Sequence, residues 1–329
     1  MNESLKSSLV FFLKLLVTLI PAYFVYLNIS KTPGIAFTNV YHLFSNAKIW
    51  FLILAFLSLG ISNLTGCFQW KILLENQGVQ LRYGHLLKLY FVGLFFNNFM
   101  PGNVGGDLKK IYDIRIDSKQ DTIGAGFTAT IFDRLFGLFF LNALALGVGA
   151  LFFIHDPEHR VFLLPSLWVF IGFTLFLATL FSKRLGKILF RLSSWMLPSK
   201  IQERFSRMQS RFHYFRKTPL WISIIALSAI TQTLRVLVHF FCGLAIGVDI
   251  AVSWYFFYIP MIAVISALPI SIGGFGPREL LAQSLFAKAG VPGLESVLIQ
   301  LLAYFISLIL SLFGAVFFLN HKKPLKTSH

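Results

Sequence analysis

Eight apolar segments dominate this chain of 329 residues, and most of them are long enough to cross a lipid bilayer. A bilayer core needs roughly 20 apolar residues in one helix, and in lipid the backbone polar groups must be satisfied within helices or closed barrels. With a hydrophobic content of 56% and a mean hydropathy of +0.73, the chain is predicted to be an all-α polytopic membrane protein of about six to eight membrane helices. The segments lie at about 9–28, 50–68, 86–100, 135–154, 161–181, 219–247, 252–272 and 296–319, with a weaker one at 277–289.

A single integral membrane domain, 1–329, is expected, because the apolar segments leave no stretch for a soluble catalytic domain. Two repeat halves, 1–181 and 219–319, are joined by segment 182–218, which holds 10 of the 29 Lys and Arg residues. Pro198 separates two amphipathic pieces of this segment. Such pieces are expected to lie at the membrane surface, either as anchors or to recruit lipid headgroups.

The formal net charge of +16 is explained largely by this basic segment, since a Lys and Arg excess is typical of the cytoplasmic side, next to anionic lipid. Nucleic acid is not an expected partner, because no recognition module or aromatic stacking platform is visible. Cys67 and Cys242 lie far apart in apolar stretches and form no metal-ligand spacing. The motifs of nucleotide, dinucleotide and zinc-hydrolase sites are also missing from the sequence, so neither a metal nor a cofactor is expected.

The same breakpoint occurs at the end of two apolar segments. Residues 100–107 read Met-Pro-Gly-Asn-Val-Gly-Gly-Asp, and residues 268–275 read Leu-Pro-Ile-Ser-Ile-Gly-Gly-Phe. In both, three residues separate a proline from Gly-Gly. A cation follows within four residues of the last residue of the motif: Lys109 and Lys110 after the first, and Arg278 after the second. Proline removes a backbone donor and glycine removes side-chain cover, so neither suits a helix in lipid unless the freed backbone has a function. Two broken segments in corresponding places are typical of a transporter site at the interface of an inverted repeat.

Loop charges predict that the two broken segments are re-entrant. Segment 182–218, the region 109–134 and the basic C-terminal tail are predicted to be cytoplasmic, and the acidic loop 155–160 external. All basic segments fall inside only if 86–100 and 252–272 dip into the membrane and return. The sequence therefore predicts a multi-pass protein of the inner (plasma) membrane with cytoplasmic N- and C-termini, in which the two tips enter from opposite sides.

The first breakpoint carries groups suited to an anion. Consecutive glycines expose backbone N–H groups that can form an anion-binding concavity. Asp107 is either the N-cap of a helix beginning at Leu108 or a functional carboxylate. Lys109 and Lys110 oppose the dipole of that helix, so they are either solvated or hold a phosphate. The candidate substrate-binding residues here are Asn97, Asn98, Gly105, Gly106, Asp107, Lys109 and Lys110.

The second breakpoint opens a helix that begins with Gly276-Pro277 and closes at Gly290. Glu279 suits the N-terminal dipole of this helix, whereas Arg278 does not. A guanidinium beside exposed N–H groups can clamp a phosphodiester, and the alternative for Arg278 is a structural pair with Glu279 or Asp133. The candidate residues here are Gly273, Gly274, Arg278 and Glu279.

A cation also lies at membrane depth, where it is costly and usually faces a cavity or a partner. Gln232, Arg235 and His239 follow helical spacing in the middle of 219–247, so they share one face. This face lines either a functional cavity or a closed polar network. Arg134, beside Asp133, is expected at the opening of the span 135–154, where it either snorkels to the interface or pairs with the breakpoint charges.

Taken together, these motifs resemble the lysylphosphatidylglycerol synthase transmembrane (flippase-like) family over essentially the whole chain. Lys110 stands where that family often has Arg, and Asp133 where it often has Glu, so both keep the charge. The resemblance implies a module that translocates aminoacylated or otherwise modified phospholipids. Bifunctional members carry a soluble aminoacyl-transferase domain after the membrane part, and this chain stops after its last span, so synthesis of the lipid is not expected. The shared residues are Asn97-Asn98, Met100-Pro101-Gly102, Gly105-Gly106-Asp107, Lys110, Asp133-Arg134 and Gly273-Gly274-Phe275-Gly276-Pro277-Arg278-Glu279.

The leading hypothesis is a lipid translocase, not an enzyme, that moves a phosphate-containing lipid, aminoacylated or glycosylated, across the inner membrane. Lys110, Arg278 and glycine N–H groups would hold the phosphate, while Arg235 and His239 line the path. The expected partners are the bilayer and an anionic or modified phospholipid, with a homo-oligomer or a separate lipid-modifying enzyme as candidate protein partners.

Two alternatives remain open at this point. One is a membrane-embedded transferase acting on a lipid-linked substrate, with Asp107 or Glu279 as general base. The other is an accessory membrane protein without transport activity.

Overall fold

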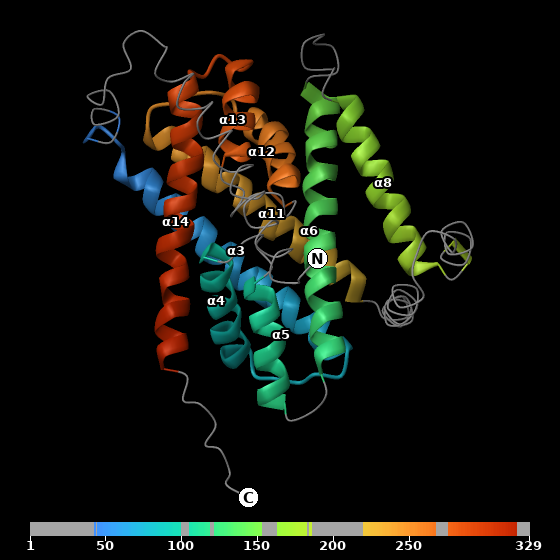
Figure 1. The fold of residues 1–329 in the computed structure, drawn as a ribbon. Coiled ribbons are helices and arrows are strands. Elements are labelled where there is room, and N and C mark those ends of the chain that lie inside the picture. Colours follow the sequence, from blue (N-terminus) through green and yellow to red (C-terminus); the bar gives the residue numbers. More distant parts are fainter. Residues whose placement is uncertain are drawn as a thin grey trace, which may run out of the picture.

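The described part of the chain is built from α-helices and contains no strand. The computed structural model describes residues 45–99, 105–118, 122–152, 163–182, 220–267 and 276–320, together with Leu43, Arg184 and Leu185. The main helices are α3 (Ile49–Asn76), α4 (Tyr83–Phe99), α5 (Gly105–Ser118), α6 (Ile123–Phe152), α8 (Leu163–Phe181), α11 (Leu220–Ala245), α12 (Val252–Ala267), α13 (Pro277–Ala287) and α14 (Gly293–Leu319) (Figure 1).

Five of these helices, α3, α6, α8, α11 and α14, have the length and hydropathy to cross a membrane, and α12 is a shorter apolar helix. This confirms the predicted all-α polytopic membrane class. The apolar segment 9–28 lies outside the described residues, as do residues 100–104 of the first breakpoint, residues 268–275 of the second, and nearly all of the basic segment 182–218.

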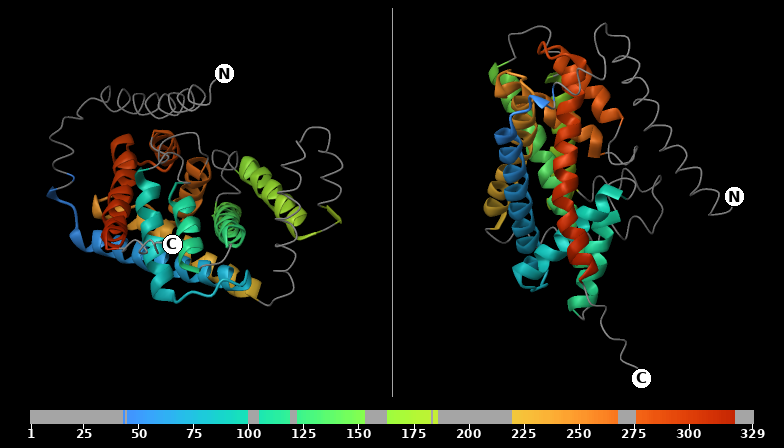
Figure 2. Two further views of the ribbon diagram at one scale, coloured as in Figure 1. Left: turned by 60° about the horizontal axis from the view of Figure 1, so that its bottom comes forward. Right: turned by 90° about the vertical axis from the view of Figure 1, so that its left-hand side faces the viewer.

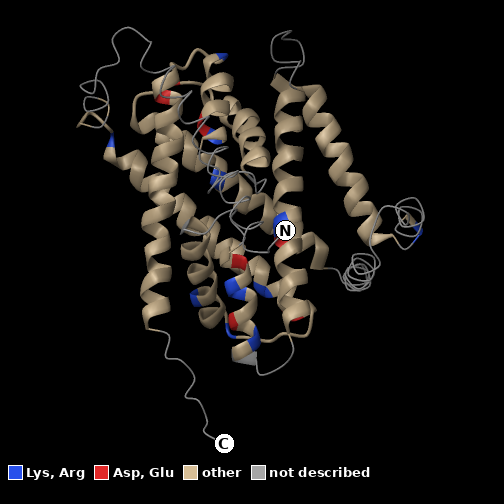
Figure 3. Ribbon diagram, viewed as in Figure 1, with Lys and Arg blue, Asp and Glu red and all other residues tan. Residues whose placement is uncertain are grey.

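The outer surface of the bundle is apolar, as lipid contact requires. Large side chains such as Trp50, Leu151 and Trp168 are exposed, and α8 carries no charged residue. Figure 3 shows long uncharged stretches on α8 and α14, while charged residues gather between the helices and at the lower end of the bundle. This pattern inverts the arrangement of a water-soluble protein, in which charge covers the outside.

The described helices follow the same order twice: one long helix, two short helices, and a second long helix. The first run is α3, α4, α5 and α6, and the second is α11, α12, α13 and α14. In Figure 1 the short pair α4 and α5 lies towards the lower end of the bundle, and α12 and α13 lie towards the upper end.

Contacts between the two runs are reciprocal. α3 packs along α11, α4 packs on α14, and α12 packs on α6. Both views in Figure 2 show α3 beside α11, and the left-hand view shows α8 at the periphery, where it packs against α6. The first short helix of each run is therefore held by the last long helix of the other run, and the second short helix, α5 or α13, packs on the last long helix of its own run.

Two helix contacts are so close that only glycine fits. A Cβ at Gly106 of α5 would lie 1.8 Å from the carbonyl oxygen of Gly93 in α4. A Cβ at Gly314 of α14 would lie 2.0 Å from the carbonyl oxygen of Phe91. Small residues are the usual means by which helix backbones approach each other within a membrane, and here they place α4 between α5 and α14.

Two helix starts differ from the predicted ones. α6 begins at Ile123 rather than near residue 135, because its first turns carry small residues such as Gly126, which pack against Ile111 of α5. Asp133 and Arg134 therefore lie inside α6 and not at its opening. α5 begins at Gly105 rather than Leu108, so Asp107 belongs to the first turn and is not the N-cap.

Candidate functional site

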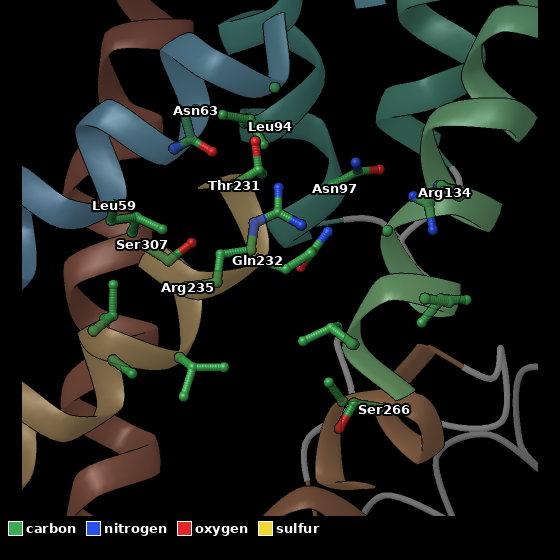
Figure 4. A pocket seen from close by; sticks show the side chains of 18 of the residues that line it. Leu59, Asn63, Leu94, Asn97, Arg134, Thr231, Gln232, Arg235, Ser266 and Ser307 are labelled. Atoms are coloured by element: carbon green, nitrogen blue, oxygen red, sulfur yellow. The ribbon is translucent and has the colours of Figure 1, made fainter. Parts of the chain in front are cut away.

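A central cavity of about 440 Å³ lies among the helices of both runs. Its volume falls within the range of small-ligand sites, about 300–1,000 Å³. Side chains from α3, α6 and α11 point towards a common space in the close-up of Figure 4. The polar residues that line the cavity are Asn63, Gln69, Tyr90, Asn97, Asn98, Asp107, Lys110, Asp133, Arg134, Thr231, Gln232, Arg235, His239, Ser266, Arg278, Gln300, Tyr304 and Ser307.

Positive charge predominates in this lining. Each of four helices supplies one cation, and only two carboxylates accompany them, so the lining carries two positive charges in excess with His239 neutral. The cations are Lys110 of α5, Arg134 of α6, Arg235 of α11 and Arg278 of α13, and the carboxylates are Asp107 and Asp133. A surplus of cations at membrane depth is costly unless an anion binds there.

Asp107 joins two of the cations. Its Oδ1 lies 3.0 Å from Lys110 Nζ, and its Oδ2 accepts a hydrogen bond from Arg134 Nε. Burial by itself would raise the pKa of this carboxyl, but the charges and hydrogen bonds of Lys110 and Arg134 outweigh that effect and hold the pKa below its ordinary value. Asp107 is thus a charged link between α5 and α6, the pairing that was one of the two predicted roles of Arg134.

Lys110 is also enclosed by aromatic rings. Its Nζ lies 4.9 Å from the ring centroid of Trp70 and 4.8 Å from that of Tyr90. The lysine is 6% exposed. Cation–π attraction of this kind is strongest for a desolvated cation, so α3, α4 and Asp107 together fix the position of the ammonium.

Asp133 is held from the side of α3. Gln69 Nε2 donates to Asp133 Oδ1 at 2.9 Å, and Ser228 Oγ of α11 donates to Gln69 Oε1 at 2.9 Å. This chain of hydrogen bonds crosses three long helices. It orients Asp133 and satisfies polar groups that have no water partner within a membrane.

Arg235 is the cation least engaged by the protein. Its guanidinium makes no ion pair with a carboxylate in the described ranges, and it points into the centre of the cavity beside Thr231 and Gln232 in Figure 4. One turn further on, His239 Nδ1 lies 3.1 Å from the backbone oxygen of Arg235. Because a carbonyl only accepts, Nδ1 carries the proton, and in neutral His239 the Nε2 atom is an acceptor.

Arg278 and Glu279 form the start of α13. Glu279 Oε2 accepts from Gly276 N at 2.8 Å, and Glu279 Oε1 accepts from Arg278 Nε at 3.0 Å. Gly276 has a φ of 89°, which favours glycine. The structural pair between Arg278 and Glu279 therefore exists, while the guanidinium also lines the cavity and lies 5.4 Å from the ring centroid of Tyr304.

The structure brings most of the predicted site residues together. Nine of them line the cavity: Asn97, Asn98, Asp107, Lys110, Arg134, Gln232, Arg235, His239 and Arg278.

Four other predicted residues do not line the cavity. Lys109 forms an ion pair with Asp113, and Gly106 N donates to Asn97 Oδ1 at 2.8 Å, so this N–H is already used. Gly105 and Glu279 are also outside the cavity lining. Gly273 and Gly274 lie outside the described residues.

Several lining residues were not predicted. Gln300, Tyr304 and Ser307 of α14 and Asn63 and Gln69 of α3 all face the cavity. In α14 these residues are spaced by four and three positions, and in α3 Gly66 of the lining lies three positions from both Asn63 and Gln69. Polar residues at such helical spacing within apolar spans are the signal that would have identified them. In the part of the chain that the structure describes, no group of three or more His, Cys, Asp or Glu side chains could hold a metal ion.

Comparison with known proteins agrees with this architecture. Two UPF0104 membrane proteins are similar over most of their length. The one from Pyrococcus horikoshii is 25% identical over 315 residues, which covers 87% of this chain and 91% of that protein. The one from Methanothermobacter thermautotrophicus is 23% identical over 308 residues, covering 86% and 87%.

The sequence profile of the lysylphosphatidylglycerol synthase TM region matches residues 11–314. This range includes every helix of the two runs except the last residues of α14. The match extends over nearly the whole chain, including all the residues that line the central cavity. The chain therefore belongs to the family of the lysylphosphatidylglycerol synthase TM region.

Proposed function

We propose that this protein is a lipid translocase whose central cavity takes up the phosphate-bearing headgroup while the acyl chains stay in the bilayer. The observation that carries the proposal is the convergence of four cations from four helices on one cavity lined by two carboxylates. With Glu279 paired to Arg278 from outside the lining, one positive charge remains in excess. A cation at the centre of a membrane helix costs about 2.5–3.5 kcal/mol on insertion scales. An anionic ligand would offset that cost, and a lipid phosphate is the anion most abundant in the bilayer.

The two short helix pairs are proposed to be re-entrant and related by an inverted repeat. α12 is described over 16 residues, which span about 24 Å at 1.5 Å per residue, less than a bilayer core of about 30 Å. α4 is described over 17 residues, and the prolines at 101 and 269 that follow the two helices do not suit a longer helix. Lys110 and Arg278 lie on the second short helix of each run, so a headgroup could pass from one end of the bundle to the other between them.

Both candidate general bases, Asp107 and Glu279, are already engaged by cations, which favours transport over catalysis. Asp107 is engaged by Lys110 and Arg134, and Glu279 is engaged by Arg278 and the backbone of Gly276. A carboxylate stabilised in its charged form by cations is a poor general base. The protein is accordingly proposed to form no covalent bond with the lipid and to act in the inner (plasma) membrane, with both termini cytoplasmic.

The experiment that tests this function is lipid movement by the purified protein in liposomes. Phospholipids labelled on an acyl chain are followed by loss of signal to an impermeant quencher. We expect protein-dependent movement that falls about tenfold or more in Arg278→Gln, since a charged hydrogen bond contributes about 1.5–3 kcal/mol.

Lys71→Gln is the matched control. Lys71 forms an ion pair with Glu75 at 2.6 Å on α3 and does not line the cavity, so its loss should leave lipid movement unchanged. The proposal is wrong if the folded, inserted parent moves no phospholipid, or if Lys71→Gln and Arg278→Gln behave alike.

A further inference from the structure

We infer that the headgroup this cavity accepts is an uncharged polyol or sugar on a phosphate, and that a headgroup bearing an additional ammonium is disfavoured. The inference rests on the proposed function and names its substrate class. Three features of the lining lead to it: the carboxylates, the aromatic faces, and the neutral hydrogen-bonding groups.

Both carboxylates of the cavity already interact with groups of the protein. Asp107 is shared by Lys110 and Arg134. Asp133 accepts a hydrogen bond from Gln69, and the charges of Lys110 and Arg235 act on it. Asp133 forms no ion pair in the described ranges, but an ammonium placed here would compete for it with Lys110 and Arg235 and would meet the positive charge of both. Such like-charge contacts are strongly unfavourable in a desolvated site.

The aromatic faces that would attract an ammonium are already covered. At the α5 end Tyr90 lines the cavity, and the ammonium of Lys110 lies over its ring and over that of the buried Trp70. At the α13 end, the guanidinium of Arg278 lies over Tyr304. In the described part of the chain a protein cation thus already lies over each of the two aromatic rings that line the cavity, Tyr90 and Tyr304, so a ligand ammonium would compete with that cation for the ring.

The remaining lining consists of amides and hydroxyls. Thr231 Oγ1 and Gln232 Oε1 are buried and have no hydrogen-bond partner in the described part of the chain, although the two residues are only 4% and 5% exposed. A buried polar atom without a partner is costly. A hydroxyl both donates and accepts, so a polyol or sugar can satisfy these groups.

The position of these unpartnered atoms also fits the phosphate assignment. Thr231 and Gln232 precede Arg235 on the same helix by four and three residues, and all three point into the centre of the cavity in Figure 4. Other amides and hydroxyls of the lining, from α3 and α14, are Asn63, Gln300 and Ser307. A phosphate at Arg235 would therefore place its attached headgroup among neutral hydrogen-bonding groups.

The test compares two lipids that share the phosphate and the glycerol and differ by an amine-bearing lysyl ester. Liposomes with the full-length protein receive acyl-labelled phosphatidylglycerol or acyl-labelled lysylphosphatidylglycerol, whose glycerol carries an aminoacyl group with two amines. We expect phosphatidylglycerol to move about tenfold faster or more. Phosphatidylethanolamine, which replaces the glycerol by an ethanolammonium, should also be slow.

A gain-of-function variant tests the physical cause. Gln232→Glu keeps the shape of the side chain and adds a carboxylate to the cavity, so the ratio of the two rates should shift towards the lysyl lipid. Gln232→Leu removes the hydrogen-bonding group without adding charge. It should slow phosphatidylglycerol without improving the lysyl lipid.

The outcomes separate this inference from the function on which it rests. Equal or faster movement of lysylphosphatidylglycerol by the parent would leave translocation standing and overturn the headgroup assignment. Absence of movement for every lipid would overturn both. A rate ratio that favours phosphatidylglycerol and is moved by Gln232→Glu supports both.

Discussion

At the scale of single residues, the four cations of the cavity differ in whether a carboxylate of the protein pairs with them. Lys110, Arg134 and Arg278 each have a carboxylate partner, whereas Arg235 has none in the described ranges and is the cation left for a ligand. Sequence spacing predicted that Arg235 would face a cavity or a network, because a cation in an apolar span is informative by itself. It could not predict that Lys110 lies between Trp70 and Tyr90, since these contacts join residues far apart in the chain.

Asp107 gives a residue-scale prediction for stability against pH. Its pKa is lower in the folded protein than in the unfolded chain, so the unfolded chain binds more protons in acid and the stability from this group is present above the ordinary carboxyl pKa near 3.8. That contribution is lost as the pH falls through the lower folded-state pKa. Asp107→Asn should therefore be less stable at pH 7 by roughly 3 kcal/mol, and the difference should shrink in acid.

Thermal unfolding of the detergent-purified protein between pH 3 and pH 7 measures this difference. Asp113→Asn is a suitable comparison, because Asp113 pairs with Lys109 away from the cavity lining. A gap between parent and Asp107→Asn that stays constant down to pH 3 would contradict the assigned role of the carboxylate.

At the scale of elements, the length rule for apolar segments predicted the long helices well. The predicted segments 50–68, 161–181, 219–247 and 296–319 correspond to α3, α8, α11 and α14. The start of α6 was placed too late, because Asp133 and Arg134 suggested a membrane interface. Their charges instead face a polar cavity inside the bundle, a surrounding that a single sequence does not reveal.

The contact between α4 and α5 gives an element-scale prediction. Gly106→Ala would force a Cβ against the backbone of Gly93, so the two helices must separate, at a cost of about 1–3 kcal/mol. Gly60→Ala in α3 is the control, because a Cβ there meets nothing within 4 Å and alanine is the better helix former. Unfolding temperatures should fall for the first variant and stay level or rise for the second; equal temperatures would refute the close contact.

At the scale of the whole molecule, the twofold order of helices places two short pairs at opposite ends of the bundle (Figure 1). The sequence indicated this arrangement through two matching breakpoints and the distribution of basic loops. It could not indicate that α4 is held by α14 and α12 by α6, because exchange of short helices between the two runs depends on tertiary packing.

The proposed topology predicts which ends of the short pairs face which side of the membrane. Arg115, in the last turn of α5, should be cytoplasmic, and Lys288, at the end of α13, should be external. A membrane-impermeant thiol reagent applied to intact cells should label Lys288→Cys and spare Arg115→Cys until the membrane is opened. The native Cys67 and Cys242 are buried, which keeps the background low. Labelling of both variants from one side would contradict the re-entrant arrangement.

The most direct test of the central claim is the rate of phosphatidylglycerol movement in liposomes for the parent, Arg235→Lys and Arg235→Gln. Among the described residues Arg235 is the cavity cation without a carboxylate partner, so its charge is expected to act on the ligand rather than on the fold. We predict that Arg235→Gln folds and inserts like the parent but moves lipid at least about tenfold more slowly, and that Arg235→Lys keeps an intermediate rate. Movement by Arg235→Gln at the parent rate would contradict the claim that this cavity carries the lipid phosphate.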